Sequence, residues 1–320
     1  MNILVIGCGA IGSFYAERLA NARATVTVTA RGAHLDALKR KGLTVVHDGE
    51  TRHQAVTACS HAELQSASQA DDFDVIVVAL KATQTKALLN ELGSWLAAGK
   101  TPVVSVQNGV DNEPLLASVV GQARVWGGLS VRSGGEISQP GVATTTGIYK
   151  IIMGPWPASN TLPTNLMALA SLWQSQHIPL EVSEDIRKEL WKKLIVNCGV
   201  NPLSAVTRQK TYALTHQPEL AQKVYCAMQE TGRAAAYDGV EISPAEVDDM
   251  FSLIKSFNSI KTSMLIDLEK GRELELDAIL GSVIARCRML GKPAQITESL
   301  WTELTSKPLP DSLDGLFNRE

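Results

Sequence analysis

The amino-terminal segment constrains the fold more than any other part of this chain, because a strand, a glycine-rich turn and a helix follow one another there. Residues 2–6 are mostly aliphatic, the turn reads Gly7-Cys8-Gly9-Ala10-Ile11-Gly12, and a helical pattern follows over residues 13–20. This Gly-x-Gly-x-x-Gly pattern between a strand and a helix is typical of a dinucleotide-binding unit. A plain strand-to-helix turn is the alternative.

Each of the three glycines has its own expected role. Gly7 allows the tight turn, Gly9 lets a pyrophosphate approach the backbone, and Gly12 lets the helix pack against the strand. The free N–H groups at the helix start would face the phosphates, where the helix dipole favours negative charge. We therefore expect residues 7–12 to bind a dinucleotide cofactor.

The cofactor is expected to be NADP(H) rather than NAD(H). An NAD-preferring domain usually ends its second strand with Asp or Glu, which binds the ribose 2′-hydroxyl. Here the second expected strand, residues 25–30, contains no acidic residue and runs into Arg31. A cation at that place can bind the 2′-phosphate of NADP. An ordinary surface arginine after a strand is the alternative.

Composition argues against several classes of protein. The 320 residues suit two domains, and 45% of them are hydrophobic, so large cores can form. The net charge of −3 comes without an extended basic stripe, which argues against a nucleic-acid partner. Five scattered cysteines suit a reducing compartment, the histidines show no metal-ligand spacing, and no apolar run suffices to cross a membrane. We expect a cytoplasmic protein without a metal site; a homodimer remains open.

Strands and helices alternate in the first half of the sequence. Expected strands are residues 2–6, 25–30, 43–46, 54–58, 74–80, 102–106 and 124–131, and expected helices fall near residues 11–21, 33–40, 83–97 and 112–119. Such alternation predicts an α/β fold with a parallel, doubly wound sheet of the Rossmann type.

The first domain is expected to end near residue 182. A β-rich stretch from Glu136 to Met153 should add hairpins to the sheet. A helix near residues 164–176 and a short strand at 178–182 would then complete a domain of residues 1–182.

A mostly α-helical second domain is expected at residues 183–320, because strand signals nearly vanish there. Ser183 is expected to cap its first helix, and Ser243-Pro244-Ala245-Glu246 has the pattern of a capping box. Further helices are expected at residues 262–270, ending at Gly271, and from about Glu273 to residue 290.

Polar residues follow two expected strands of the sheet. Lys81 comes directly after residues 74–80, Gln84 lies three positions further, and Gln107-Asn108-Gly109 follows residues 102–106. Ligands of open α/β sheets bind beyond the carboxyl ends of strands, so Lys81, Gln84 and Asn108 are candidates for cofactor contact. A solvated lysine and a simple Asn-Gly turn are the alternatives.

The second domain carries a polar helix face within an apolar segment. Lys193, Asn197 and Asn201 are four residues apart, so a helix would place them on one face, where they could hold a keto acid and protonate its carbonyl. The alternative for Lys193 is a weak surface ion pair with Glu189. Two further polar residues lie near expected helix starts. Their spacing alone indicates no more than a helix cap for Ser263 and a first-turn acid that the helix dipole favours for Glu275.

Together these residues resemble the ketopantoate reductase (2-dehydropantoate 2-reductase) family along essentially the whole chain. Beyond the glycine motif and Arg31, the resemblance rests on Leu80-Lys81-Ala82-Thr83-Gln84, Gln107-Asn108-Gly109, Glu189-Leu190-Trp191-Lys192-Lys193-Leu194, Asn197-Cys198, Asn201-Pro202-Leu203-Ser204-Ala205, Ser263-Met264-Leu265-x-Asp267 and Glu275-Leu276-Asp277. The block around Lys193 and the twelve-residue spacing from Ser263 to Glu275 are more specific than the glycine motif.

The resemblance implies an NADPH-dependent reduction of ketopantoate to pantoate, in pantothenate and coenzyme A synthesis. It implies that Lys193 is the general acid and that Glu275 orients Lys193 and contacts the cofactor ribose. The other implied roles are substrate binding by Asn197, Asn201 and Ser263, contact with nicotinamide and substrate by Asn108, a cofactor pocket lined by Lys81 and Gln84, and 2′-phosphate binding by Arg31.

One position departs from the family pattern. Thr211 stands where the family often has a substrate-contacting asparagine, and a hydroxyl cannot offer both an amide donor and a carbonyl acceptor. The chain could therefore act on another small 2-keto acid or on a bulkier ketone. A non-catalytic NADP(H)-binding sensor is a third interpretation, and the Lys193/Glu275 pair argues against it. An NAD-dependent hydroxyacid dehydrogenase is disfavoured by Arg31 and by the missing strand-end acid.

Overall fold

The computed structural model describes residues 1–131, 134–147 and 150–313, which form two compact units. Unit 1 consists of residues 1–107 and 112–186, and unit 2 consists of residues 108–111 and the chain from residue 187 onward. The short segment 108–111 thus leaves unit 1 after a strand, packs within unit 2 and returns.

The larger sheet of unit 1 contains, among the described residues, eight strands: β1 Asn2–Ile6, β2 Thr25–Thr29, β5 Thr57–Cys59, β6 Val75–Val78, β7 Val103–Ser105, β8 Val125–Val131, β11 Lys150–Pro155 and β12 Leu180–Val182. Their order is β12–β11–β8–β7–β6–β1–β2–β5. All neighbouring strands are parallel except β8 and β11, which are antiparallel. The expected parallel, doubly wound sheet is confirmed.

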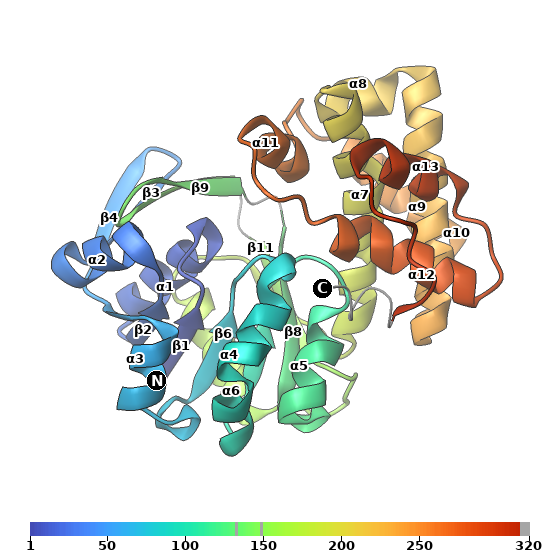
Figure 1. Ribbon diagram of the computed structural model, residues 1–320. Helices are drawn as coiled ribbons and strands as arrows, with labels where there is room; N and C mark the ends of the chain where they lie inside the picture. The colour runs from blue at the N-terminus through green and yellow to red at the C-terminus, as the bar shows by residue number, and fades with distance from the viewer. Residues whose placement is uncertain (132–133, 148–149, 314–320) are drawn as a thin grey trace. The chain divides into compact units, whose positions relative to one another are not determined.

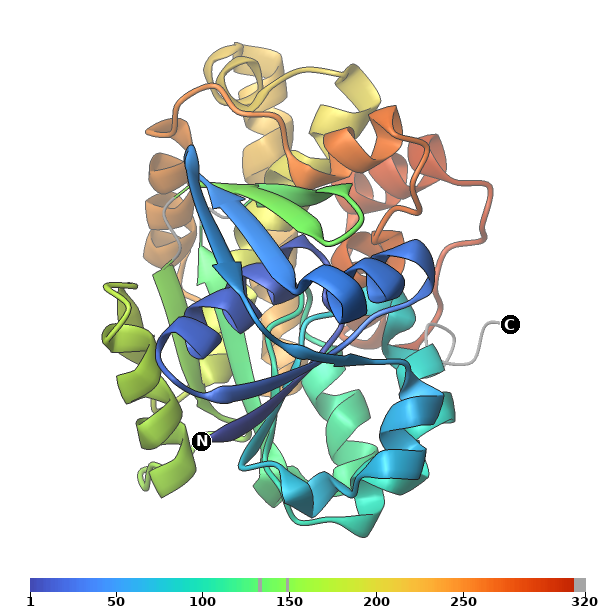
Figure 2. The same ribbon diagram turned by 90° about the vertical axis from the view of Figure 1, so that its left-hand side faces the viewer.

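β1 is buried on both sides because both faces of this sheet are covered. Ile3 and Val5 belong to one core cluster, whereas Leu4 and Ile6 belong to the other, as the alternation of side chains along a strand requires. Figure 2 shows α6 on one side of the strands and α4 and α5 on the other. The helices of unit 1 are α1 Ala10–Asn21, α2 Gly32–Lys41, α3 His61–Ala67, α4 Thr85–Ala98, α5 Asn112–Val120 and α6 Thr164–Gln174. Of these, α3 was not expected.

A second, smaller sheet corrects part of the expectation that residues 136–153 extend the main sheet: β11 does join that sheet, whereas the two strands before it do not. The smaller sheet is formed by β3 Leu43–His47, β4 Glu50–Gln54, β9 Gly134–Gln139 and β10 Val142–Thr146, in the order β4–β3–β10–β9 (Figure 1). The expected strand at 54–58 is wrong, because β4 pairs with β3 and β5 pairs with β2. Leu43, Val45 and Ala143 are buried in the core cluster that contains Phe14 of α1, so the small sheet is held by apolar packing against that helix.

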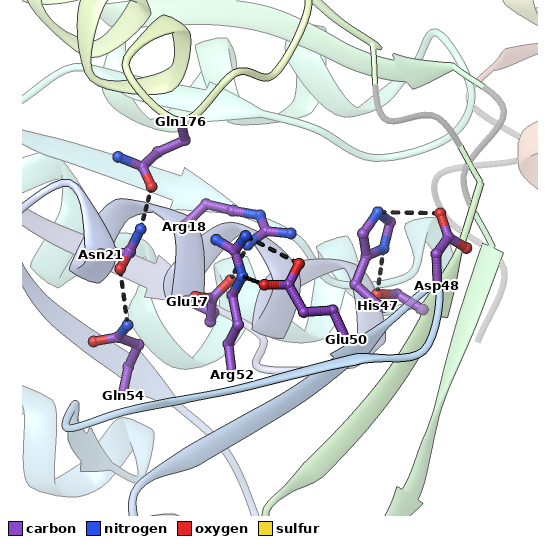
Figure 3. A network of polar contacts seen from close by, with 10 residues as sticks. Glu17, Arg18, Asn21, His47, Asp48, Glu50, Arg52, Gln54 and Gln176 are labelled. Atoms are coloured by element: carbon purple, nitrogen blue, oxygen red, sulfur yellow. Dashed lines mark hydrogen bonds and ion pairs between the residues drawn. The ribbon is translucent and has the colours of Figure 1, made fainter.

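A polar network joins α1 to the strands of the small sheet (Figure 3). The Arg18 guanidinium lies 3.1 Å from the Glu17 carboxylate, and both side chains are buried. Burial raises the pKa of the Glu17 carboxyl, and the charge of Arg18 counters that shift. The Asn21 amide donates to Gln176 at 2.5 Å and accepts from Gln54 of β4 at 3.3 Å. The far end of α1 is therefore fixed to both the small sheet and the segment after α6.

The described part of unit 2 consists of helices and connecting loops and has no strand, which confirms the expected mostly α-helical second half. Its helices are α7 Ile186–Thr207, whose first residue still belongs to unit 1, α8 Thr211–His216, α9 Pro218–Ala235, α10 Pro244–Lys255, α11 Ser263–Glu269, α12 Ser282–Met289 and α13 Gln295–Leu304, with a π-helical turn at Asp277–Gly281. The expected capping box is present: the Ser243 side chain accepts from the Glu246 amide, and the Glu246 carboxylate accepts from the Ser243 amide at 3.0 Å.

Three expected helix starts in this region are displaced. The first helix begins at Ile186, because the Ser183 amide donates to the carbonyl oxygen of Met153 at 2.8 Å and extends the pairing of β12 with β11. The cap of α11 is Thr262, whose side chain accepts from the Leu265 amide. Glu275 precedes the next helix rather than lying in its first turn, because helical geometry starts at Leu276.

Candidate functional site

The glycine-rich turn of unit 1 presents free backbone amides at the start of α1. Gly7 has φ +96°, which favours glycine, and Gly9 is the N-terminal cap residue of α1. Within the described residues, the amides of Gly9, Ala10 and Ile11 donate to no protein acceptor, since intrahelical bonding begins when Ser13 donates to the Gly9 carbonyl oxygen at 2.7 Å. This helix end has the donors that a pyrophosphate requires.

The space around Gly12 and Gly9 agrees with the roles expected for these glycines. A Cβ added to Gly12 would lie 2.0 Å from the Gly7 carbonyl oxygen, so any side chain there would displace the turn. A Cβ on Gly9 would meet no atom within 4 Å, which leaves open space where a phosphate group would approach the backbone. The residues present therefore fit a dinucleotide at this turn.

Side chains and backbone groups hold the turn in place. The amides of Gly7 and Cys8 donate to the hydroxyl and carbonyl oxygens of Thr29, at 3.0 and 2.9 Å. Burial raises the pKa of the Cys8 thiol to about 11, so Cys8 stays protonated at neutral pH and serves the loop as a small buried side chain. The end of β2 and the glycine turn consequently form one rigid corner.

Arg31 lies at the position where we expect a residue that binds the 2′-phosphate of NADP. It follows the end of β2, is exposed, and is the N-terminal cap residue of α2. β2 carries only Thr and Val residues, so no carboxylate opposes a phosphate there.

Lys81 and Gln84 lie beyond the carboxyl end of β6, as the sequence predicted. Both are half-buried, and a short 3-10 turn at Ala82–Gln84 leads from them into α4. The neighbouring Gln107, beyond β7, is buried and donates to the Thr85 hydroxyl at 2.8 Å, so it supports the start of α4.

Asn108 and Glu275 come together within unit 2 although they are 167 residues apart in the sequence. The Asn108 amide donates to the Glu275 carboxylate at 3.1 Å, and Glu275 is buried at 8% exposure. Gly109 has φ +95°, and a Cβ there would lie 3.2 Å from the Ala278 carbonyl oxygen. The Asn-Gly pair therefore lets the backbone of segment 108–111 approach the helix that follows Glu275.

The polar face of α7 carries Lys193 and Asn197, both half-buried, and Asn201, which is buried. The Asn201 amide donates to the exposed Ser263 hydroxyl at 3.5 Å, so the structure brings these two predicted substrate residues together. Glu189 pairs with Lys192 at 3.2 Å, which counts against the simple Glu189–Lys193 ion pair.

A buried ion cluster supports segment 108–111, and sequence reasoning missed it. The Arg286 guanidinium of α12 lies 2.7 Å from Asp111 and 2.9 Å from Asp238, and it also lies over the ring of Trp191 at 5.3 Å from the centroid. Burial raises the pKa of the Asp111 carboxyl, and the positive charge of Arg286 counters that shift. Neither spacing nor a local motif could have joined residues 111, 238 and 286.

Thr211 does not present its side chain as a substrate-contacting group. It is 1% exposed, its hydroxyl accepts from the Ile260 amide at 3.1 Å, and it donates to the Asn258 carbonyl oxygen at 3.4 Å. The hydroxyl is therefore used to hold the segment that leads into α11.

This environment predicts the effect of changing Thr211. Thr211→Asn should lower stability by about 1–3 kcal/mol, because the larger amide must fit a filled site, and we expect no gain in the use of ketopantoate. Thr211→Val should cost about 1 kcal/mol through the lost hydroxyl. Thermal unfolding and the KM for ketopantoate would test this; better ketopantoate use by the asparagine variant would show that this position does reach the substrate.

Two kinds of feature are absent from residues 1–131, 134–147 and 150–313. No three His, Cys, Asp or Glu side chains there are grouped so as to hold a metal ion. None of the helices there has the length and apolar character needed to cross a bilayer.

Comparison with known proteins decides the family. The model of ketopantoate reductase PanE/ApbA matches residues 3–158, and the model of its C-terminal part matches residues 185–307. The chain belongs to the ketopantoate reductase PanE/ApbA family. Members of this family are NAD(P)-dependent oxidoreductases.

Proteins of known name are similar to this chain along nearly its whole length. A 2-dehydropantoate 2-reductase of Pyrococcus abyssi is 28% identical, over 98% of this chain and 99% of that protein. The crystal structure of 2-dehydropantoate 2-reductase from Methylococcus capsulatus has a TM-score of 0.84 and 27% identity, over 97% and 99% of the two chains. A D-mandelate dehydrogenase bound to NADH and anilino(oxo)acetate shares the fold, with a TM-score of 0.85, 20% identity and coverage of 95% and 97%.

Proposed function

We propose that this chain reduces 2-dehydropantoate (ketopantoate) to pantoate with NADPH, a step of pantothenate and coenzyme A synthesis. The observation that carries the proposal is the polar face of α7, where a lysine and two asparagines follow one another at four-residue spacing and Asn201 bonds to Ser263. The full-length match to the family supports it. In this proposal residues 1–182 bind the cofactor, and residues 183–320 bind the substrate.

Residues of unit 1 would hold the cofactor. The free amides at the start of α1 are suited to the pyrophosphate, and Arg31 is suited to the 2′-phosphate. Lys81 and Gln84 would line the pocket beyond β6. Once bound, the cofactor supplies the hydride for the ketone carbon.

Residues of unit 2 would bind the substrate and supply the proton. Asn197, Asn201 and Ser263 offer hydroxyl and amide groups for the hydroxyl, carbonyl and carboxylate oxygens of a 2-oxo acid. Lys193 would donate a proton to the alkoxide oxygen, and its positive charge would stabilise that oxygen most in the transition state. Glu275 would orient Lys193 and contact the cofactor ribose, and Asn108 would reach the nicotinamide and the substrate.

The decisive experiment follows the loss of NADPH absorbance when ketopantoate is added, beside NADH and a panel of other 2-oxo acids. Fast oxidation of NADPH with ketopantoate alone supports the proposal. NADPH binding without turnover of any ketone would favour the sensor interpretation and contradict the proposal.

Reduction of a different 2-oxo acid is the second candidate. It is favoured by Thr211, because the hydroxyl is buried and an amide that the family often offers the substrate is absent. The shared fold of a D-mandelate dehydrogenase means that the fold alone does not select the substrate. In the same panel, slow turnover of ketopantoate beside fast turnover of another acid would establish it.

Arg31→Ala is expected to raise the KM for NADPH by roughly 10- to 100-fold, because a charged hydrogen bond to a phosphate is lost. The KM for NADH, which lacks the 2′-phosphate, should change little. Arg40, exposed at the other end of α2, provides the matched control, since Arg40→Ala removes the same charge away from the turn. Equal effects of Arg31→Ala on both cofactors would rule out the phosphate role.

A further inference from the structure

His34 of α2 bridges the glycine-rich turn and the small sheet. Its Nε2 lies 2.9 Å from the carbonyl oxygen of Cys8, and its Nδ1 lies 3.0 Å from the amide nitrogen of Gly141. Gly141 lies in the turn between β9 and β10. All three residues belong to unit 1.

The two partners fix the protonation state of the ring. The Gly141 amide can only donate, so Nδ1 must accept, and Nε2 therefore carries the hydrogen that is donated to Cys8. Only neutral imidazole makes both bonds at once. Burial lowers the pKa of His34, which favours the same neutral form.

The bond from His34 is the shorter of two that hold the Cys8 carbonyl oxygen, to which the Ser13 hydroxyl also donates at 3.3 Å, and these bonds orient the peptide plane between Cys8 and Gly9. In a trans peptide the C=O and the following N–H point in opposite directions, so holding the Cys8 carbonyl fixes where the Gly9 amide points. That amide is one of the free donors at the start of α1. A side chain outside the glycine motif thus helps to orient a donor within it.

Gly141, the second partner of His34, is held in place by contacts of its own. Gly141 has φ +82°, its carbonyl oxygen accepts from the Thr44 amide at 3.0 Å, and a Cβ there would lie 3.1 Å from the Ala37 side chain. The turn therefore packs against α2 and is bonded to the start of β3. His34 links this fixed point to the glycine turn.

We propose that His34 is a positioning residue for the cofactor diphosphate, which holds the Gly9 amide in its binding orientation by coupling the Cys8 carbonyl to the β9–β10 turn. This inference rests on the proposed binding of NADP(H) at residues 7–12. His34 acts through the backbone of the turn and needs no contact with the cofactor.

The chain offers a sharp test, because glutamine can imitate both bonds of the ring. A glutamine Oε1 can accept from Gly141 while its Nε2 donates to Cys8, whereas the asparagine side chain is one methylene shorter and alanine makes neither bond. The matched control is His53→Ala, which removes an exposed histidine of β4 whose Nδ1 bonds to the Thr44 hydroxyl. NADPH affinity of each purified variant would be measured by calorimetry, beside its melting temperature.

His34→Ala and His34→Asn should weaken NADPH binding by roughly three- to ten-fold, the equivalent of a lost hydrogen bond. His34→Gln should bind within about two-fold of the wild type, and His53→Ala should bind like the wild type. Wild-type affinity in His34→Asn or His34→Ala would overturn the inference. Weak binding by His34→Gln with an unchanged melting temperature would also overturn it, because the ring itself would then be required. Failure of the wild-type chain to bind NADPH would instead overturn the cofactor proposal on which the inference rests.

Discussion

Replacing Lys193 by alanine is expected to lower turnover by about two to four orders of magnitude, the usual contribution of a positioned general acid. NADPH affinity should change little, because Lys193 is proposed to contact the substrate oxygen, and the residues proposed for the cofactor phosphates lie in unit 1. The physical reason is that the alkoxide oxygen would lose both its proton donor and the positive charge that stabilises it in the transition state. Steady-state kcat and a separate NADPH titration check the two parts of the prediction.

Lys192 provides the matched control for that experiment. It precedes Lys193 on α7, is also half-buried, and pairs with Glu189 at 3.2 Å and Glu246 at 3.5 Å. Lys192→Ala should cost at most about 1 kcal/mol of stability and leave kcat close to that of the wild type. Similar turnover in both variants would remove Lys193 from the mechanism.

Arg286→Met is expected to lower the free energy of unfolding by about 3–5 kcal/mol, because it leaves Asp111 buried without its cation. Segment 108–111 would lose an anchor, so the hydrogen bond between Asn108 and Glu275 should weaken as well. Denaturant unfolding measures the loss of stability. Turnover at saturating substrate measures the effect on the site.

The loss of stability in Arg286→Met should depend on pH. Burial already raises the pKa of the Asp111 carboxyl, and removal of Arg286 removes the charge that opposes this shift. The folded variant would then bind a proton that the unfolded chain releases, so its stability should fall as the pH rises through the acidic range. The variant should therefore be closer to the wild type in acid than at neutral pH.

Arg288, two residues further along α12, provides a control for the arginine substitution. It is half-buried and pairs with Glu298 at 3.2 Å and with the exposed Asp311 at 2.7 Å. Arg288→Met should cost at most about 1 kcal/mol, as for other solvent-exposed pairs. Equal losses in the two variants would show that the cluster around Arg286 contributes no special support.

Much of the fold could be predicted because the deciding signals are local. The glycine turn, the apolar run of β6 and the capping box at Ser243 each act over a few neighbouring residues, and the structure has each where the sequence indicated. The small sheet could not be predicted, since β3 pairs with β10 about a hundred residues away and neither stretch of sequence indicates its pairing partner. Pairing partners depend on packing, here of Leu43 and Ala143 in the core beside α1.

The candidate site, like the fold, could be predicted only in part. The sequence by itself determined the residue types: a glycine turn, Arg31 without an opposing acid, and the four-residue spacing of Lys193, Asn197 and Asn201 on one helix face. Family membership follows from that linear order, since each motif is read from neighbouring residues.

Only the tertiary structure decided which distant groups meet. It joined Asn108 to Glu275 and Asp111 to Arg286, it buried Thr211 against the segment before α11, and it gave His34 two backbone partners. The order of neighbouring residues determines turns and helix faces, because these depend on short-range geometry. The contacts named here depend instead on how separate elements pack. A hydrogen bond or a buried ion pair exists only where that packing brings donor and acceptor within about 3 Å.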